Sequence, residues 1–562
     1  MAGGLMNLVA PGQMNLLLNG NPQKSFWKAV YKKYTLFGMQ RFTLTYNGSP
    51  TLSLNTDSVF TFNVERYADL IMDTFLSIQL PPIWSPIYPP QEIIQADGTT
   101  FWTDWAPYEF RWIRNIGAQI IRHVEIFIGS QTIQKYSGSY LLSAVQRDFT
   151  AEKRELFNEM IGQVPELVDP ANANGRSGAY PNAYYTDNSA GAEPSIPSRT
   201  LMIPLNLFYS LNTQQALPLV ALQYNEVTIR ITLRPVREWF QIRDVNNYLD
   251  GYPYVQPNFN EGLMQMYRFL QPPPDIAINT ASYINQTTNW PANIHLDATY
   301  VFLSTDEREL FAKAELIYPI RTVREMYFYD ITGQQTVELN STGMVTSWLF
   351  YFQRSDVNLR NEWSNYTNWA YQGVQPVNVV IAPDEGAYPV IDPSGAMITI
   401  GPGQNQDGTQ TGLWINQDYT PVNVEVILET MEILFGGNNR ENMLPYEVYN
   451  YLEKYTRTGG GGNTDGLLVY NFCLNTSTSA ANPNGAQTMS PFNRIEMRFS
   501  TILPPFDINA QTLNICNDGE LIGINKPTWN IYQYNFNLIV FEEMFNRLII
   551  TDGKGGLEYQ YS

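Results

Sequence analysis

The sequence predicts an all-β protein built from antiparallel sheets. Apolar and polar residues alternate with a period of two in several runs, which places one face of a strand on a core. Aromatic residues make up 14% of the chain and add β-propensity. Proline pairs such as Pro81-Pro82 and Pro89-Pro90 stand between the runs, as turns require.

The clearest expected strand runs from Val227 to Leu233, where valine, isoleucine and leucine alternate with threonine and arginine. Similar runs cover 422–426, 495–499 and 532–538. Strand sets this regular are typical of antiparallel sheets. Long polar insertions at 162–198, 240–292 and 355–420 are expected to form surface loops that leave the core unchanged.

Helix signals are few. Apolar residues recur at helical spacing from Tyr140 to Ile161, which predicts one helix there. A second helix is expected from Asp306 to Leu316, where Ser304 and Glu307 resemble a capping box. This second helix lies near the middle of the chain, with strand-rich sequence on both sides. We therefore expect it to connect two β domains.

The length of 562 residues fits two units of about 270 residues as well as four smaller ones, at roughly 150 residues per average domain. Each half ends with a strong alternating strand, Asp297 to Ser304 and Tyr532 to Phe541. The two halves share a pattern of elements, without evident residue identity between them. An internal duplication is therefore suggested by pattern alone.

The charge balance excludes some partners. The chain has 34 Lys and Arg against 53 Asp and Glu, a net charge of −19. A duplex binder needs surplus cations to displace counterions, so direct binding of nucleic acid is not expected. Steering of the whole chain to an anionic lipid surface is disfavoured for the same reason, although a local basic patch stays open.

Cysteine usage and hydropathy favour a reducing, cytosol-like compartment. The only cysteines are Cys473 and Cys516, too few for a disulfide framework, and free buried thiols are the favoured state over a pair. No run of 18 apolar residues is present, so no membrane-spanning helix is expected. The first 20 residues lack the basic and apolar regions of a secretory signal.

Catalytic and metal-binding patterns are weak. His123 and His295 lack the short spacing of metal-ligand pairs, so packing or hydrogen-bonding roles are expected. The glycine run Gly459 to Gly462 matches no phosphate-binding loop and suggests a flexible linker or turn. Glu542 and Glu543 are adjacent, so in a strand they would point to opposite faces and not form a catalytic pair. We expect no enzyme activity, no cofactor and no metal.

Two further signals concern turns and glycans. Asp552-Gly553 follows the run Leu548 to Ile550 and predicts a hairpin turn. Five Asn-x-Ser/Thr triplets are candidate glycosylation sites. Without a signal peptide, host-type glycosylation is not expected, and a chain rich in Asn and Thr also produces such triplets by chance. They begin at Asn47, Asn285, Asn340, Asn365 and Asn475.

Three segments carry a resemblance to a known family. The first 35 residues contain AGGL, LVA, NGNPQ, FWK and VYKKYT. Residues 217–227 read LPLVALQYNEV, and residues 300–308 read YVFLSTDER. These segments resemble the double jelly-roll major capsid proteins of the nucleocytoplasmic large double-stranded DNA viruses. Two departures are Pro11, where the family usually has tyrosine, and Lys32-Lys33, where arginines are common.

The resemblance implies two tandem eight-stranded jelly-roll β-sandwiches joined by a short helical linker, with long loop insertions. The expected division is an N-terminal inner-face segment at 1–26, a first jelly roll at 27–305, a helical linker at 306–317 and a second jelly roll at 318–562. Lys24, Lys28, Lys32 and Lys33 are then candidate inner-face contacts.

The implied function is that of a structural subunit. Three copies would form a pseudo-hexagonal homotrimer, and these capsomers would tile an icosahedral shell. Expected partners are neighbouring capsomers, minor capsid and penton proteins and, indirectly, an internal membrane layer, without direct contact to nucleic acid. The expected location is the virion, with assembly in the host cytoplasm.

Two other functions stay open at this point. A carbohydrate-binding or carbohydrate-active β-sandwich protein would use loop aromatics such as Trp363, Trp369 and Tyr371 to stack on sugar rings, although buried loop anchors are the favoured interpretation of these residues. A minor capsid or vertex protein of the same fold would be distinguished only by its copy number.

Overall fold

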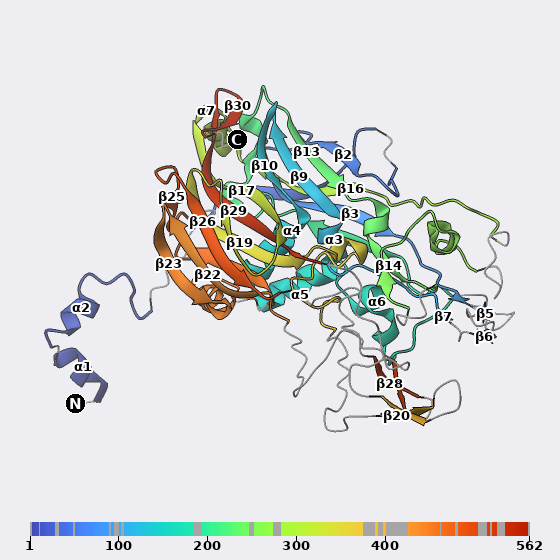
Figure 1. Ribbon diagram of the computed structural model, residues 1–562. Helices are drawn as coiled ribbons and strands as arrows, with labels where there is room; N and C mark the ends of the chain where they lie inside the picture. Colours follow the sequence, from blue (N-terminus) through green and yellow to red (C-terminus); the bar gives the residue numbers. More distant parts are fainter. Residues whose placement is uncertain are drawn as a thin grey trace.

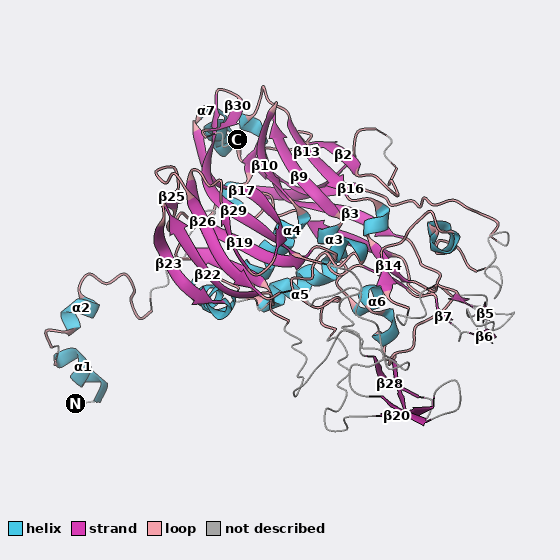
Figure 2. Cartoon of the chain, in the orientation of Figure 1, coloured by secondary structure: helices cyan, strands magenta, loops and turns pink. Residues whose placement is uncertain are grey.

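The chain folds into two β-sandwiches that lie side by side, with few helices (Figures 1 and 2). The computed structural model describes residues 3–10, 12–27, 33–48, 51–88, 92–94, 100–102, 106–183, 193–246, 252–273, 283–374, 388–391, 397–400, 425–460, 462, 464–477, 482–503, 514–517, 520–524 and 534–559.

The first sandwich consists of two antiparallel sheets, each with four main strands. One has the order β1 (Phe37–Leu44), β16 (His295–Leu303), β3 (Leu70–Leu80) and β11 (Arg199–Pro204), with β12 (Leu217–Pro218) also on β3. The other has the order β10 (Gln131–Tyr136), β9 (Ile121–Ile128), β13 (Val227–Leu233) and β2 (Ser58–Asn63). Numbered along the chain, main strands 1, 8, 3 and 6 form one sheet and main strands 5, 4, 7 and 2 form the other, which is the strand order of a jelly roll.

The second sandwich repeats this topology. One sheet has the order β17 (Leu316–Ile331), β29 (Phe536–Thr551), β19 (Met344–Arg354) and β24 (Leu467–Asn471), with β25 (Gln487–Thr488) and β30 (Lys554–Leu557) at its edges. The other has the order β18 (Gln334–Glu338), β26 (Ile495–Thr501), β22 (Leu428–Phe435) and β23 (Asn438–Pro445). In both sandwiches the first, eighth, third and sixth main strands share one sheet. The predicted pair of jelly rolls is confirmed.

Short elements decorate the two sandwiches. Small strands form hairpins and a three-stranded sheet in the loops: β4 (Ile87–Tyr88), β5 (Glu92–Ile94), β6 (Thr100–Trp102), β7 (Ala106–Pro107), β8 (Phe110–Trp112), β14 (Phe240–Arg243), β15 (Tyr254–Val255), β20 (Tyr388–Ile391), β21 (Met397–Ile400), β27 (Asn514–Asn517) and β28 (Glu520–Ile524). Short α-helices are α1 (Met6–Val9), α2 (Asn15–Asn19), α3 (Ile116–Gln119), α6 (Pro165–Val168) and α8 (Glu453–Arg457), the last preceded by a π-helical turn at Val448–Leu452.

The helix predicted over Tyr140 to Ile161 is in fact two helices, α4 (Gly138–Asp148) and α5 (Ala151–Met160). The break lies at Phe149 and Thr150, which both have extended backbone angles. The Thr150 hydroxyl accepts a hydrogen bond from the Lys153 N–H and so begins the second helix. Apolar residues continue at helical spacing across the break, but the extended backbone at Phe149 ends the first helix and Thr150 caps the second.

The connecting helix is α7 (Thr305–Lys313), and Leu316 already begins β17. The predicted capping box is wrong, because the Ser304 side chain makes no capping hydrogen bond. Asp69 instead holds this end of the helix by accepting from the Leu303 N–H at 2.9 Å and pairing with Arg308 at 2.9 Å.

Other sequence expectations have mixed outcomes. The strands predicted at 227–233 and 495–499 are present as β13 and β26, while residues 422–424 and 532–533 lie outside the described residues. The hairpin turn at Asp552-Gly553 joins β29 to β30, with φ of 51° and 79°. Positive φ at both positions is typical of a tight two-residue hairpin.

The sheet that contains β29 is buried on both faces. Leu538 and Val540 belong to the core between the sheets of the second jelly roll. Their neighbours Ile539 and Phe541 belong to a cluster that is continuous with the core of the first jelly roll. The two sandwiches therefore share an apolar contact in which α4 and β10 of the first meet β17, β19 and β29 of the second (Figure 1).

Candidate functional site at the contact between the two jelly rolls

Helix α4 carries the polar groups that join the two jelly rolls. Its first turn is capped by the Ser137 hydroxyl, which accepts from the Tyr140 N–H at 3.2 Å. The Ser137 N–H in turn donates to the Glu325 carboxylate on β17 at 2.7 Å. The start of this helix is therefore fixed to the second jelly roll as well as to the first.

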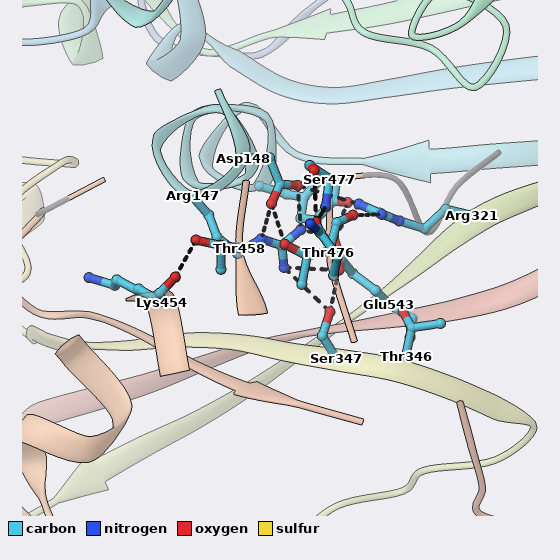
Figure 3. A network of polar contacts seen from close by, with 12 residues as sticks. Arg147, Asp148, Arg321, Thr346, Ser347, Lys454, Thr458, Thr476, Ser477 and Glu543 are labelled. Atoms are coloured by element: carbon cyan, nitrogen blue, oxygen red, sulfur yellow. Dashed lines mark hydrogen bonds and ion pairs between the residues drawn. The ribbon is translucent and has the colours of Figure 1, made fainter. Parts of the chain in front are cut away.

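The last turn of α4 inserts Arg147 into the second jelly roll (Figure 3). Its guanidinium donates to both carboxylate oxygens of Glu543 on β29, each at 2.9 Å, and to both oxygens of Asp148, at 2.8 and 2.9 Å. The side chains of Arg147 and Glu543 are fully buried. Two bidentate contacts of this kind fix the geometry of the planar guanidinium.

Further donors complete the network. Arg321 on β17 donates to Glu543 at 3.2 Å, and the Tyr140 hydroxyl donates to the same carboxylate at 2.6 Å. The Ser347 hydroxyl on β19 also donates to it. The Thr476 hydroxyl donates to Asp148 at 2.5 Å. We call Tyr140, Arg147, Asp148, Arg321, Ser347, Thr476 and Glu543 the inter-domain network.

The charges of the inter-domain network balance, with two guanidinium groups against two carboxylates. Burial opposes ionisation of Glu543, but Arg147 and Arg321 outweigh it, so the pKa of this carboxyl lies far below its usual value. Burial and the neighbouring Glu543 charge raise the pKa of the Tyr140 phenol well above its usual value. The Glu543 carboxyl thus stays ionised, and the Tyr140 phenol stays protonated, in the physiological pH range.

The adjacent Glu542 lies on the other face of β29, inside the core of the second jelly roll. It accepts hydrogen bonds from the Trp348 indole at 3.0 Å and from the Ser341 hydroxyl. Burial raises its pKa above the usual value, although these two donors oppose the shift. As expected from strand geometry, the adjacent carboxylates Glu542 and Glu543 occupy separate environments and form no catalytic pair.

The glycine run makes a third contact between the jelly rolls. A Cβ on Gly460 would lie 2.3 Å from the Phe149 carbonyl oxygen, and one on Gly462 would lie 1.8 Å from the Gln146 carbonyl oxygen. The Thr464 hydroxyl also donates to the Gln146 side chain at 3.2 Å. The described part of this run is thus not the flexible linker that the sequence suggested, because glycine is needed there for close backbone approach to the end of α4.

A loop after β19 attaches the second jelly roll to the small β15-β14-β8 sheet. Asn361 donates to the Phe240 carbonyl at 2.8 Å, and the Gln241 amide donates to Glu362 at 2.8 Å. Within the loop, Asp356 accepts from Arg354 and Arg360 at 2.7 to 3.0 Å. This second buried ion cluster orders the loop after β19.

The aromatic residues considered for sugar stacking belong to the same loop after β19. The Trp363 indole donates to the Glu238 carbonyl at 3.1 Å, and Arg234 covers its ring at 4.4 Å. The Tyr371 hydroxyl donates to the Tyr254 carbonyl at 2.6 Å. Trp369 is half-buried, and its carbonyl accepts from Asn365 at 2.8 Å. These contacts are those of loop anchors.

A cavity of about 60 Å³ lies beside the network, lined by Tyr136, Tyr140, Phe208, Arg321 and their neighbours. Its size suits one or two water molecules. Within the described ranges, no cluster of three or more His, Cys, Asp or Glu side chains has a geometry that could hold a metal ion. The chemistry that this arrangement supports is the fixing of one sandwich against another.

The two histidines lie apart on different strands. His123 is half-buried on β9, and burial lowers the pKa of its imidazole. His295 begins β16, where its Nδ1 lies 2.8 Å from the Asn293 carbonyl oxygen and its Nε2 lies 3.6 Å from Asp297. Cys473 is a free, buried thiol, as expected, while the side chain of Cys516 lies outside the described residues.

The glycosylation candidates differ in exposure. Asn47, Asn285 and Asn340 are exposed, and Asn475 is half-buried. Asn365 is 1% exposed, and its side chain is held by Thr367 and by the Trp369 carbonyl. A glycan on Asn365 would require this loop to open, so its burial argues against modification of the folded chain.

The candidate inner-face lysines lie in and beside an N-terminal arm, which we define as residues 3–27. The arm extends away from the sandwiches (Figure 1). Lys24 and Lys33 are exposed, whereas Lys28 and Lys32 lie outside the described residues.

The inter-domain network was not predicted from the sequence. One signal was available, because Glu542 and Glu543 interrupt the apolar run from Leu538 to Phe545. A charge in such a run requires a buried partner. The identity of that partner, Arg147, has no counterpart in local pattern, since 396 residues separate the two.

Comparison with known proteins shows which family the chain resembles. The family described as the major capsid protein N-terminus matches residues 25–297. A major capsid protein of Chrysochromulina ericina virus is 30% identical over 352 residues, covering 61% of this chain and 54% of that protein. The major capsid protein of Paramecium bursaria Chlorella virus 1 is 24% identical over 565 residues, with both chains covered in full. Residues 25–297 thus match the N-terminal part of the major capsid protein family, and the chain as a whole is similar to double jelly-roll major capsid proteins of large double-stranded DNA viruses.

Solved structures agree on the double jelly-roll fold. A quasi-atomic model of the PBCV-1 virus capsid matches with a TM-score of 0.58 and 19% identity, covering 96% of this chain and 100% of that chain. The Faustovirus major capsid protein matches with a TM-score of 0.58 and 12% identity, covering 96% and 95%. The chain spans about half the length of three curated relatives it matches, from Chrysochromulina ericina virus, Phaeocystis pouchetii virus and Acanthamoeba polyphaga mimivirus.

Proposed function

We propose that this protein is the structural subunit of an icosahedral virus shell, and that it works as a homotrimer with a pseudo-hexagonal outline. The observation that carries the proposal is the repeated topology, in which two sandwiches of identical strand order are locked side by side. Three such pairs present six similar sandwiches around one axis. A closed ring of this kind uses the same contact repeatedly, as symmetric assemblies do.

The inter-domain network and the glycine contact support this role mechanically. A shell subunit must hold a fixed angle between its two sandwiches, because every neighbour depends on it. Buried, hydrogen-bonded ion pairs specify one arrangement even where they add little net stability. Here the network is buried, electrically neutral and built from three strands, one helix and the turn that carries Thr476.

Exposed apolar side chains on the second jelly roll support an assembly function. Tyr329 on β17 and Tyr455 on α8 are 66% and 87% exposed. Large exposed aromatics are typical of surfaces that become buried between subunits. Interfaces of obligate assemblies usually bury ~2,000–5,000 Å².

The proposal includes a division of labour along the chain. Residues 27–305 and 318–562 form the two jelly rolls, 306–317 link them, and 1–26 face the inside of the shell, where Lys24, Lys28, Lys32 and Lys33 meet inner-layer partners. Neighbouring capsomers, minor capsid proteins and penton proteins complete the partner set. The net charge of −19 argues against direct contact with nucleic acid. The role is structural, not catalytic, and the location is the virion after assembly in the host cytoplasm.

Glycans on the outer loops are a further part of the proposal. Asn47, Asn285 and Asn340 are exposed, as attachment of a glycan requires, and Asn475 is half-buried. Intact-mass spectrometry of protein purified from virus particles tests this directly.

Sedimentation equilibrium at low micromolar concentration tests the proposed assembly. We expect a species of about three times 64.2 kDa. A well-folded monomer that persists across the concentration range would overturn the proposed trimer.

A further inference from the structure

The N-terminal arm exposes an unusual amount of apolar surface. It contains two short helices, α1 and α2, neither longer than five residues. Its large apolar side chains are between 48% and 104% exposed: Leu5, Met6, Leu8, Val9, Met14, Leu16, Leu17, Leu18, Phe26 and Trp27. Ten such residues within 25 positions are far more than a surface tolerates without a partner.

The charge of the arm and its junction with β1 is opposite to that of the rest of the chain. The first acidic residue in the sequence is Asp57. The preceding 56 residues contain Lys24, Lys28, Lys32, Lys33 and Arg41, a net charge of +5. The remaining residues therefore carry −24, since the whole chain carries −19. The arm together with its junction with β1 therefore complements an anionic surface, whereas the body does not.

The order of residues within the arm favours a lipid surface over a protein groove. The first 23 residues contain no charge, and the next five read Lys-Ser-Phe-Trp-Lys. Aromatic rings flanked by lysines suit the interfacial layer of a bilayer, where rings sit at headgroup depth and ammonium groups meet anionic lipids. The helices are too short to present the repeated i, i+3, i+7 face that a groove-binding helix needs.

We propose that the N-terminal arm binds an anionic lipid bilayer directly, by inserting its leucine, methionine and aromatic side chains into the interfacial layer. No helix within the described ranges is long and apolar enough to cross a bilayer. In the proposed binding mode the arm lies along the bilayer surface. The arm also holds the acidic body at a distance from the anionic lipid. Electrostatic repulsion between the two is weak there, because it is screened beyond ~8 Å at physiological salt. This inference goes beyond the proposed shell function, which assigns the membrane only an indirect role.

Flotation of the full-length protein with lipid vesicles tests the proposal. Vesicles of phosphatidylcholine with about 30 mol% phosphatidylserine, which carry a negative surface potential, are compared with phosphatidylcholine alone at ~0.15 M NaCl. We expect binding to the anionic vesicles at least tenfold stronger than to the neutral ones. Binding should weaken when salt is raised, because part of the attraction is electrostatic.

Two arm variants separate the apolar and the electrostatic contributions. Phe26→Ser with Trp27→Ser removes the aromatic anchors, and Lys24→Glu with Lys28→Glu reverses two charges. Each pair should weaken binding to anionic vesicles at least tenfold, since one lysine near such a surface contributes a factor of about five. Tyr224→Ser and Lys554→Glu are matched controls on exposed positions of the body, and should bind vesicles as the unchanged protein does.

Sedimentation of the same samples keeps this test independent of the shell function. The arm variants should retain the oligomer of the unchanged protein while losing vesicle binding. The proposal is overturned if the unchanged protein does not float with anionic vesicles, or if the arm variants float equally well. It is also overturned if the arm variants lose the oligomer and keep vesicle binding, because the arm would then bind a second copy of the chain.

Discussion

Arg147 and Glu543 form a buried, bidentate ion pair with two hydrogen bonds of 2.9 Å, although 396 residues separate them in the sequence. Arg147 lies in the last turn of a helix of the first jelly roll, and Glu543 lies on a central strand of the second. Neither side chain has any exposed surface. The pair therefore joins the two halves of the chain where water cannot compete for its hydrogen bonds.

Replacing Arg147 by methionine should destabilise the protein strongly. The substitution keeps an apolar stem of similar length but leaves the buried Glu543 and Asp148 carboxylates with fewer partners. Breaking one side of a buried pair costs ~3–5 kcal/mol. Thermal unfolding followed by circular dichroism should show a lower midpoint for Arg147→Met, with a smaller additional loss when Glu543→Gln is combined with it. Fully additive losses would show that the two side chains do not interact.

The adjacent pair Glu542 and Glu543 allows a matched comparison on one strand. Glu543→Gln removes a carboxylate that is stabilised by two guanidinium groups, so the unfolding midpoint at pH 7 should fall. Glu542→Gln mimics the protonated form that the core of the second jelly roll favours, so its midpoint should stay equal or rise. Equal losses for both variants would contradict the different environments assigned to the two faces of β29.

The same pair predicts opposite pH dependence. The folded pKa of Glu543 is lowered, so its contribution to stability is present above about pH 4.5 and is lost as pH falls below that value. The folded pKa of Glu542 is raised, so its contribution is present below about pH 4.5 and is lost as pH rises through the folded pKa. Unfolding midpoints measured from pH 3 to 7 should therefore fall less steeply on the acid side in Glu543→Gln than in the unchanged protein. If the unfolding midpoint of Glu543→Gln fell at low pH as steeply as that of the unchanged protein, the lowered pKa of Glu543 would be contradicted.

Lys454 predicts a rise in stability above neutral pH. This buried lysine donates to the Asn450 side chain at 2.8 Å and to the Thr464 carbonyl at 3.1 Å. Burial lowers its pKa to about 7, and the nearby Asp465 opposes the shift only in part. The unfolded chain is then protonated between about pH 7 and 10.5 while the folded chain is not, so stability should rise with pH by up to ~1.4 kcal/mol per unit. Denaturant midpoints between pH 7 and 9 measure this slope, and Lys454→Met should flatten it. A slope that Lys454→Met leaves intact would assign the effect to other groups.

Adding one methyl group to Gly460 should weaken the contact between the jelly rolls. The new Cβ would lie within 2.3 Å of a backbone carbonyl oxygen, which cannot rotate away. Gly38→Ala is the control, since no atom lies within 4 Å of a Cβ added on this exposed strand residue. Limited proteolysis should cleave Gly460→Ala faster than either the control or the unchanged protein. Equal cleavage rates would mean that the backbones can separate without cost.

The sequence predicted the fold well where strands have one buried face. The alternation from Val227 to Leu233 corresponds to a strand whose odd-numbered residues are buried and whose even-numbered residues are only partly buried. Alternation is lost in β29, because one face packs inside the second jelly roll and the other packs against the first. A strand buried on both faces reads as a continuous apolar run, so its role as the central contact strand could not be derived from period alone.

The functional contacts were harder to predict because they depend on tertiary packing. The run Gly459 to Gly462 has the composition of a linker, yet its described residues are glycines because the end of α4 comes so close. Asn365 has the same glycosylation triplet as the exposed Asn340, and only the folded loop shows that it is buried. The motifs near the N-terminus, by contrast, indicated the similarity to major capsid proteins without any structural information.

Electron microscopy of the purified protein tests the central claim most directly. The account predicts three-fold particles with a nearly hexagonal outline, in which six sandwiches of similar size surround the axis. Single particles containing only two sandwiches, at concentrations where the protein is folded, would contradict the claim that this chain builds a shell.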